Sequence, residues 1–176
     1  MLKHAGANGI GESFLAELRD RKGDEVGVIA ARLLDWCEVH LPYFWWGSGK
    51  RDGSCFPGLS RNGGAIFPFS IWTYGRIEFQ LQWMRQRPPF DNEDLMLQWL
   101  ARLNEIPSVS VTPQDVTRRP TMDMAALRDP EAMQRFFSAM EWFGEQVGAQ
   151  SSVKPDRPRS SSGAAKQHLR RCRRFP

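Results

Sequence analysis

The sequence predicts an α+β fold, in which a small antiparallel β-meander of about three strands is covered on one face by helices. Two patterns support this class. Apolar residues recur at helical spacing toward both ends of the chain, whereas residues 76–83 alternate between polar and apolar side chains. The predicted order of elements is α-α-β-β-β-α-α. A length of 176 residues suits one modest domain, which we expect to occupy residues 11–148.

Two helices are expected at the start of the chain. Residues 1–10 carry no periodic pattern, and we expect them to be frayed. Residues 11–21 place three apolar side chains on one side of a short helix. Gly23 interrupts that pattern, and Asp24 can cap the N-terminus of a second helix that runs to about Glu38.

The middle of the chain is predicted to hold the strands. Residues 41–65 are rich in glycine and aromatic residues, and we expect a loop followed by a strand near residues 54–59. The Asn-Gly-Gly sequence at 62–64 supplies the positive-φ residues of a hairpin turn. Residues 65–74 form the next predicted strand, in which Pro68 indicates an edge or a bulge.

The third predicted strand has the clearest alternation. Gly75 turns the chain, and residues 76–83 then point alternately to the two faces of the sheet. The apolar members are Ile77, Phe79, Leu81 and Trp83. The polar members are Arg76, Glu78, Gln80 and Gln82. We expect the apolar row to meet the core and the polar row to be open to solvent or to a ligand.

Helical patterns return after the double proline at 88–89. Asp91 is predicted to cap a helix that ends near Asn104, with Phe90 and Leu95 in a hydrophobic staple. Arg119 precedes a proline, which favours extended backbone at that position.

A final helix and a basic tail complete the prediction. Asp129 caps the helix, Pro130 fits its first turn, and Gly148 is expected to end it. Residues 149–176 lack periodicity and are expected to be disordered. Residues 151–176 hold eight of the 24 Lys and Arg residues and one acid, which leaves 16 basic and 19 acidic residues in the body. The pI of about 9.2 therefore reflects the tail, which could contact phosphate non-specifically.

Two adjacent indoles precede a glycine-containing turn. Trp45 and Trp46 would point in opposite directions in extended chain, so one of them faces away from the core. An outward indole beside a charged turn can stack on a base or a peptide; the alternative is that it packs under residues 118–120. The predicted binding residues are Trp45, Trp46, Lys50, Arg51, Asp52, Arg76, Glu78, Gln80, Gln82 and Arg119.

A divalent-metal-dependent, nuclease-like phosphodiesterase is the alternative function. Such enzymes place an aspartate before one strand and Glu-x-Lys on another, so that the carboxylates hold Mg²⁺. Asp52 and Glu78 fit the carboxylate positions, but Gln80 replaces the lysine and only Lys50 could substitute for it. This set is the one candidate catalytic group that the sequence offers, and the balance favours a protein that is not an enzyme.

Other chemistries lack part of their motif. The GSGK sequence at 47–50 resembles a phosphate loop, but Phe44 stands at the first glycine position and Arg51 at the hydroxyl position. No Gly-x-Ser-x-Gly sequence is present. Cys37, His40 and Cys55 are three potential metal ligands where zinc sites usually need four. We therefore expect neither a cofactor nor a bound metal in the favoured interpretation.

Composition also predicts the compartment. The three cysteines form no CxxC pair and no signal peptide is visible, which favours reduced thiols in a cytoplasm. No run of 18 apolar residues is present, so no membrane partner is expected.

A set of motifs through residues 25–147 supports a resemblance. WWGxGxxDGS, TYGxxEFQ, PPFD, RLNxI and RP follow one another, and EWFGEQV closes the run. With these motifs the chain resembles a recurring bacterial domain of unknown function and, more loosely, domains that accompany nuclease and restriction modules in bacterial defence proteins. Cys55 departs from the pattern, in which an aromatic residue is usual.

The favoured hypothesis is a non-enzymatic binding or accessory domain. Its partner would be nucleic acid or another protein, and the resemblance implies an association with nucleic-acid handling or defence systems.

Overall fold

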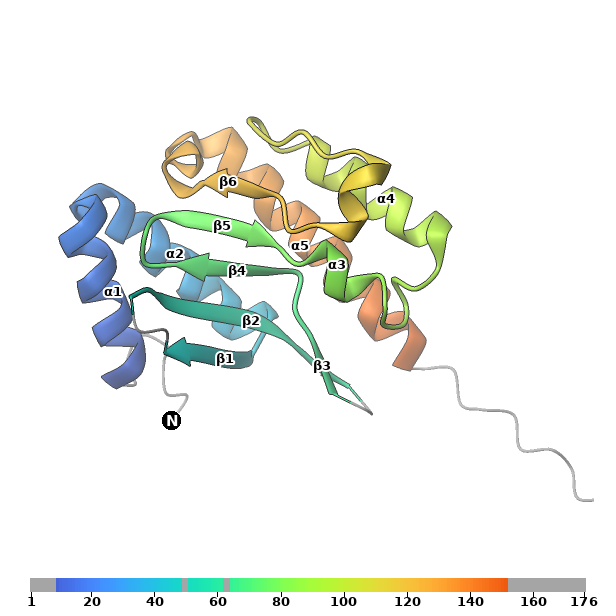
Figure 1. Cartoon of the computed structure of the whole chain (residues 1–176), viewed down its shortest axis with the longest axis horizontal. Coiled ribbons are helices and arrows are strands. Elements are labelled where there is room, and N and C mark those ends of the chain that lie inside the picture. Colours follow the sequence, from blue (N-terminus) through green and yellow to red (C-terminus); the bar gives the residue numbers. More distant parts are fainter. Residues whose placement is uncertain (1–8, 49–50, 62–63, 152–176) are drawn as a thin grey trace, which may run out of the picture.

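A computed structural model describes residues 9–48, 51–61 and 64–151. Within these residues the chain forms five α-helices and a six-stranded antiparallel sheet (Figure 1). The expected α+β class is confirmed, with twice the number of strands that the sequence predicts. The tail from residue 152, most of the predicted frayed start, Lys50 and two residues of the predicted hairpin turn lie outside the described residues.

The sheet is built around one long strand. The strands are β1 (Tyr43–Ser48), β2 (Gly53–Arg61), β3 (Gly64–Ile66), β4 (Phe69–Trp72), β5 (Arg76–Phe79) and β6 (Thr121–Asp123). They are ordered β1-β2-β4-β5-β6, and β3 pairs with the end of β2. Strand β2 therefore joins the main sheet to a short hairpin.

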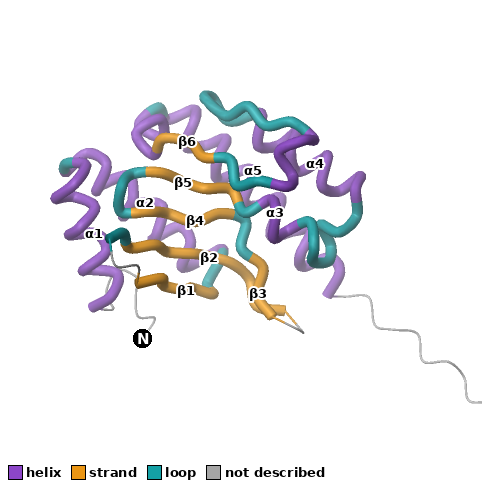
Figure 2. The backbone as a smooth tube through the Cα atoms, viewed as in Figure 1, coloured by secondary structure: helices purple, strands orange, loops and turns teal. Residues whose placement is uncertain are grey.

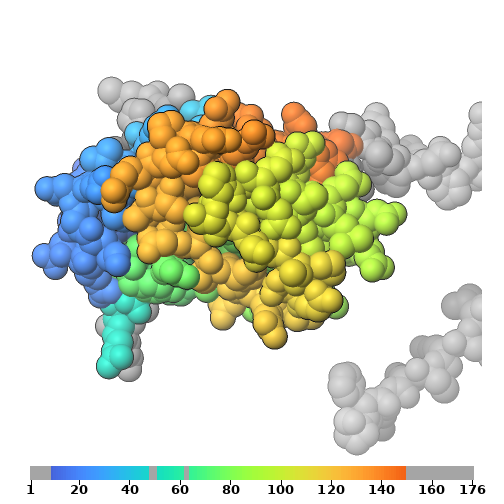
Figure 3. Space-filling view, turned by 90° about the horizontal axis from the view of Figure 1, so that it is seen from above, coloured from blue at the N-terminus to red at the C-terminus, as the bar shows by residue number. Residues whose placement is uncertain are grey.

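The helices cover one face of this sheet. They are α1 (Gly9–Lys22), α2 (Asp24–His40), α3 (Leu81–Met84), α4 (Glu93–Asn104) and α5 (Pro130–Ser151). The 3₁₀ turns η2 (Pro113–Thr117) and η3 (Met124–Arg128) flank β6. In Figures 1 and 2, α2 and α5 cross behind the strands, whereas α1 and α3 lie at the two ends of the sheet. Seen from above in Figure 3, the segment near residues 110–120 (yellow) lies along the lower edge of the molecule, which is the side of the uncovered face.

Alternate residues of the strands pack against this helix layer. Phe69 pairs with Phe79 in the register, and both rings contact Phe136 of α5, at centroid distances of 5.0 and 6.5 Å. A second aromatic group joins α4 to α5, where Trp99 stacks on Trp142 at 6.1 Å. These contacts define the core side of the sheet.

Two helices have an N-cap that differs by one residue from the predicted one. Gly23, with φ of 87°, is the N-cap of α2, so the prediction of Asp24 is wrong by one residue. Asn92, rather than Asp91, caps α4, because its Oδ1 accepts a hydrogen bond from the Leu95 amide at 2.9 Å. With Asn92 as the N-cap, Phe90 and Leu95 no longer occupy the N′ and N4 positions that form a hydrophobic staple.

The last helix begins as predicted and ends later. The Asp129 side chain accepts a hydrogen bond from the Glu131 amide at 3.1 Å, as expected of a cap. Gly148 does not end α5, which continues to Ser151. A glycine inside a helix costs about 1 kcal/mol relative to alanine, which is too little to stop a well-packed helix.

Two strand predictions need correction. Residues 43–48, expected to be a loop, form the edge strand β1, whose aromatic residues favour extended chain despite the nearby glycines. Residues 76–83 do not form one strand, because β5 ends at Phe79 and the Gln80 carbonyl accepts hydrogen bonds from the amides that open α3. Trp83 is consequently 54% exposed instead of buried.

The region around Pro68 is also divided. The proline separates β3 from β4, in keeping with the predicted edge or bulge. Ile66 of β3 lies opposite Leu59, while Ile71 of β4 lies opposite Cys55 near the start of β2. The single strand predicted over 65–74 is therefore two strands that pair with different parts of β2.

Candidate functional site

The candidate site is the sheet face that the helices leave uncovered. Residues directly opposite one another in antiparallel strands share a face. The pairs Trp45 with Phe56 and Trp72 with Arg76 alternate with the buried core pair Ile71 and Ile77, so they point to the uncovered side.

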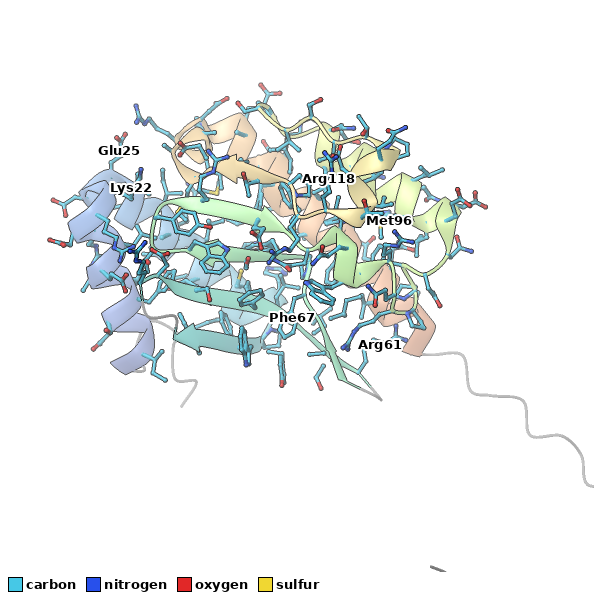
Figure 4. All side chains as sticks on the ribbon, in the orientation of Figure 1. Lys22, Glu25, Arg61, Phe67, Met96 and Arg118 are labelled. Atoms are coloured by element: carbon cyan, nitrogen blue, oxygen red, sulfur yellow. The ribbon has the colours of Figure 1, made fainter. Side chains whose placement is uncertain are left out.

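An aromatic row runs across this face. We use this name for Tyr43, Trp45, Phe56, Phe67, Trp72 and Tyr74. Phe56 is its centre, with ring centroids 4.9 Å from Trp45, 6.0 Å from Phe67 and 6.3 Å from Trp72. Tyr74 extends the row by stacking on Trp72 at 5.5 Å, and Tyr43 lies 5.8 Å from Phe67. Figure 4 shows Phe67 in front of the strands, near the end of β2.

A polar cluster lies beside the aromatic row. Gln80 donates from Nε2 to Ser70 Oγ and to Glu78 Oε1, each at 2.9 Å. Trp72 Nε1 donates to the same Ser70 oxygen at 3.0 Å, and an Arg119 guanidinium nitrogen lies 3.2 Å from Glu78 Oε1. The cluster therefore ties β4, β5 and the segment before β6 together.

This cluster is buried, which corrects the expected solvent exposure of the polar row. Glu78 is 8% exposed and Gln80 is 2% exposed, although no helix packs over the face. Arg119 contributes to this cover through its contact with Glu78, and the Trp72 indole does so through its hydrogen bond to Ser70. Arg76 is half-buried and donates to the Thr121 hydroxyl, while Gln82 lies on α3 and not on a strand.

A cavity opens where the aromatic row meets α3. We call it the α3 cavity; its volume is 210 Å³. It is lined by Trp45, Phe56, Ala65, Ile66, Phe67, Gln80, Trp83, Met84 and Arg87. Two predicted binding residues, Trp45 and Gln80, thus meet here, together with residues that the sequence alone did not single out.

Three of the other predicted residues line a separate cavity beside α1. Trp46, Arg51 and Asp52 contribute to a 650 Å³ hollow between α1 and the turn that joins β1 to β2. Asp52 pairs with Arg21 of α1 at 2.5 Å, and the backbone carbonyl of Arg51 accepts a hydrogen bond from the same guanidinium. The predicted single site is therefore divided between two places.

Trp45 is the indole of the adjacent pair that points away from the core. Trp45 is 52% exposed on the uncovered face, whereas Trp46 packs edge-on against Phe14 of α1 at 5.5 Å. The alternative position under residues 118–120 is wrong, because that segment joins β6 at the opposite edge of the sheet from β1.

The carboxylates of the phosphodiesterase alternative are not brought together. Ser54, Trp72 and Arg76 lie side by side across β2, β4 and β5. Asp52 precedes Ser54 by two residues and Glu78 follows Arg76 by two. Because β2 and β5 run in the same direction, the two carboxylates are displaced to opposite sides of this line of residues. Four residues span about 13 Å along a strand. Each carboxylate also has its own arginine partner, Arg21 for Asp52 and Arg119 for Glu78. In the described part of the chain, no three potential metal-ligating side chains cluster.

Within the part of the chain that the structure describes, both cysteines are buried. Cys37 and Cys55 are fully enclosed, and burial raises the pKa of both thiols. His40 stacks on Trp36 with ring centroids 4.2 Å apart. These thiols are held in the uncharged form that is poorly nucleophilic.

Sequence reasoning missed most of the side chains on this face, namely Tyr43, Phe56, Phe67, Trp72, Tyr74, Trp83 and Arg87. The signal that could have found Tyr74 is the turn itself, which continues the outward position of Trp72 two residues later. Trp83 and Arg87 gave no such signal, because their placement depends on the chain leaving the strand at Gln80.

Comparisons with known protein families, with curated proteins and with solved structures find no match to this chain. Among the described residues, no helix is both long and apolar enough to cross a bilayer.

Proposed function

We propose that the protein is a non-enzymatic binding domain that holds single-stranded nucleic acid on the uncovered face of its sheet. The observation that carries this proposal is the aromatic row. Bases of unpaired strands stack on aromatic side chains presented by a sheet, and such stacking tolerates any sequence because every base has a π-face. Tyr43, Trp45 and Tyr74 of the row are exposed.

The charge around the face supports an anionic ligand. Arg61, Arg87, Arg118 and Arg119 lie at the α3 end of the face, and Figure 4 shows Arg61 and Arg118 on opposite sides of α3. Arg119 pairs with Glu78, while the mostly exposed Arg118 is 4.0 Å from Asp115. The cations outnumber these two acids, so phosphates following the bases would meet positive charge.

The proposal is tested by titrating the full chain against fluorescent oligo(dA) and oligo(dT) strands and the duplex they form, at low salt. We expect the single strands to bind more tightly than the duplex. A tail variant with Arg170, Arg171, Arg173 and Arg174 replaced by Gln separates the body from the tail. We expect this variant to keep the preference for single strands and to lose part of the salt dependence.

A second variant addresses the aromatic row directly. The Tyr43→Ala, Tyr74→Ala double substitution removes the two ends of the row, and we expect single strands to bind about 5- to 150-fold more weakly per base that loses its stacking partner. Val28→Ala is the control, because Val28 is an exposed apolar residue on α2, behind the sheet. Unchanged binding by the double variant, loss of all binding in the tail variant, or equal affinity for duplex would contradict the proposal.

A further inference from the structure

We propose that the α3 cavity holds one unpaired nucleobase that bears an exocyclic amine, with the adjoining phosphate on Arg87. This inference rests on the proposed function, since it assigns one part of the single strand to one cavity on the uncovered face. It goes further by naming the chemical group that is recognised and the atoms that recognise it.

The cavity has the size and walls that a flat ring requires. Its volume is 210 Å³, and a cavity of about 150 Å³ is known to hold a benzene ring. The indoles of Trp45 and Trp83 come from β1 and α3, and each is about half exposed, at 52% and 54%. Both rings can therefore be covered by a ligand without any rearrangement of the core.

The side-chain amide of Gln80 lines the α3 cavity. Gln80 is 2% exposed and lines the cavity, and its Nε2 is turned to Ser70 and Glu78. Its Oε1 accepts no hydrogen bond from the residues that the structure describes. Because the amide orientation is fixed by these two acceptors, the oxygen is left for a donor on the ligand. The exocyclic amines of adenine, cytosine and guanine are such donors.

The charge of the cavity excludes the usual alternative for an aromatic cage. Cages that bind methylated lysine attract a cation to the ring faces. Among the described residues of the lining, Arg87 is the ionisable one, and its guanidinium donates to the Ala65 carbonyl at 3.0 Å. A fixed cation repels a second cation and attracts a phosphate, which favours a nucleotide.

The test is a titration of the isotopically labelled full chain with adenosine 5′-monophosphate, followed by NMR. The indole N–H signals of Trp45 and Trp83 are assigned with the W45F and W83F variants. We expect both signals to shift and to saturate together. Three related probes separate the contributions: adenosine lacks the phosphate, ribose 5-phosphate lacks the base, and purine riboside 5′-monophosphate lacks the amine.

Each probe has a defined expectation. Loss of the phosphate removes a charge-assisted hydrogen bond and should weaken binding about tenfold or more. Ribose 5-phosphate should leave the two indole signals unmoved. The purine nucleotide should bind more weakly than adenosine 5′-monophosphate, because Gln80 Oε1 then meets no donor. Equal binding of these two nucleotides, or shifts produced by ribose 5-phosphate, would overturn the assignment.

Protein variants distinguish this inference from the proposed function. Trp83→Ala should weaken oligo(dA) binding about 5- to 150-fold, and Trp83→Phe should restore most of it. If Trp83→Ala binds oligo(dA) like the unmodified chain while the Tyr43 and Tyr74 double variant does not, the cavity assignment fails and the proposed function stands. If the unmodified chain binds no oligonucleotide but a proline-rich peptide shifts the indole signals, both fail.

Discussion

Both faces of the sheet carry aromatic residues but use them differently. On the covered face, Phe69 and Phe79 are nearly inaccessible and meet Phe136 of α5. On the uncovered face, Trp45 and Tyr74 keep a third to a half of their surface in contact with solvent. The difference shows that aromatic content alone does not identify core, because the rings of the uncovered face pack mainly on one another.

The largest expected effect lies on the covered face. Phe136→Ala removes a ring that is fully buried between β4, β5 and α5, and we expect it to destabilise the fold by about 3–5 kcal/mol. Urea unfolding followed by circular dichroism measures the change. A loss of less than about 1 kcal/mol would mean that the covered face is not the tightly packed core that its contacts indicate.

The comparison also shows what sequence could predict. The core stripe of α5 and the inward positions of Ile77 and Phe79 follow from periodicity, since each element buries one face for its whole length. The number of strands could not be predicted, because β1 and β6 are short edge strands whose extended form depends on pairing with β2 and β5. Periodicity gives no information about pairing.

The candidate site was predicted in part for a similar reason. Trp45, Glu78, Gln80 and Arg119 were expected at a site, and the structure places them on one face. The alternation predicted the correct face of the sheet for Glu78. It also predicted a solvent-exposed side chain, which is wrong, because Glu78 is buried by residues far away in sequence, such as Arg119. Asp52 was predicted at the same site, but its carboxylate pairs with Arg21 of α1 and lines the separate cavity beside that helix.

A smaller loss of stability is expected from the polar cluster. Ser70→Ala removes the oxygen that accepts hydrogen bonds from Gln80 and Trp72, and we expect a cost of about 1–3 kcal/mol because buried donors lose a partner. Ser138→Ala on α5 is the control, since Ser138 is exposed. Equal stability of the two variants would show that the cluster is not buried as the contacts indicate.

The exposed rings should matter still less for folding. Trp83 is 54% exposed, so we expect Trp83→Ala to lower the free energy of unfolding by about 1 kcal/mol, roughly half of what full burial of a large apolar side chain contributes. This variant sharpens the comparison, because the same substitution is expected to weaken oligo(dA) binding strongly. A large destabilisation by Trp83→Ala would place this ring with the core instead.

The smallest effect concerns the turn that leads to the rim of the uncovered face. The Asp115 carboxylate accepts hydrogen bonds at 2.8 Å from the Thr112 amide and the Thr112 hydroxyl, at the start of η2. Both hydrogen bonds lower the pKa of Asp115 from its ordinary 3.8, and the bond from the Thr112 amide has the larger effect. Because the folded-state pKa is lowered, the stability that the ionised group adds is present above the ordinary pKa and is lost as the pH falls through the folded-state value.

Asp115→Asn should therefore have an effect that depends on pH. We expect the variant to melt slightly below the unmodified chain at pH 7, and the two melting temperatures to converge in acid once Asp115 is protonated. Thermal melts followed by circular dichroism across this range measure the difference, with Gln114→Ala as an exposed neighbouring control. A constant gap between the two chains at all pH values would show that the carboxylate charge does not hold η2. In that case the position of Arg118 and Arg119 at the rim would depend on the pairing of β5 with β6, on the hydrogen bond from the Gln82 amide to the Arg118 carbonyl and on the Arg119–Glu78 pair.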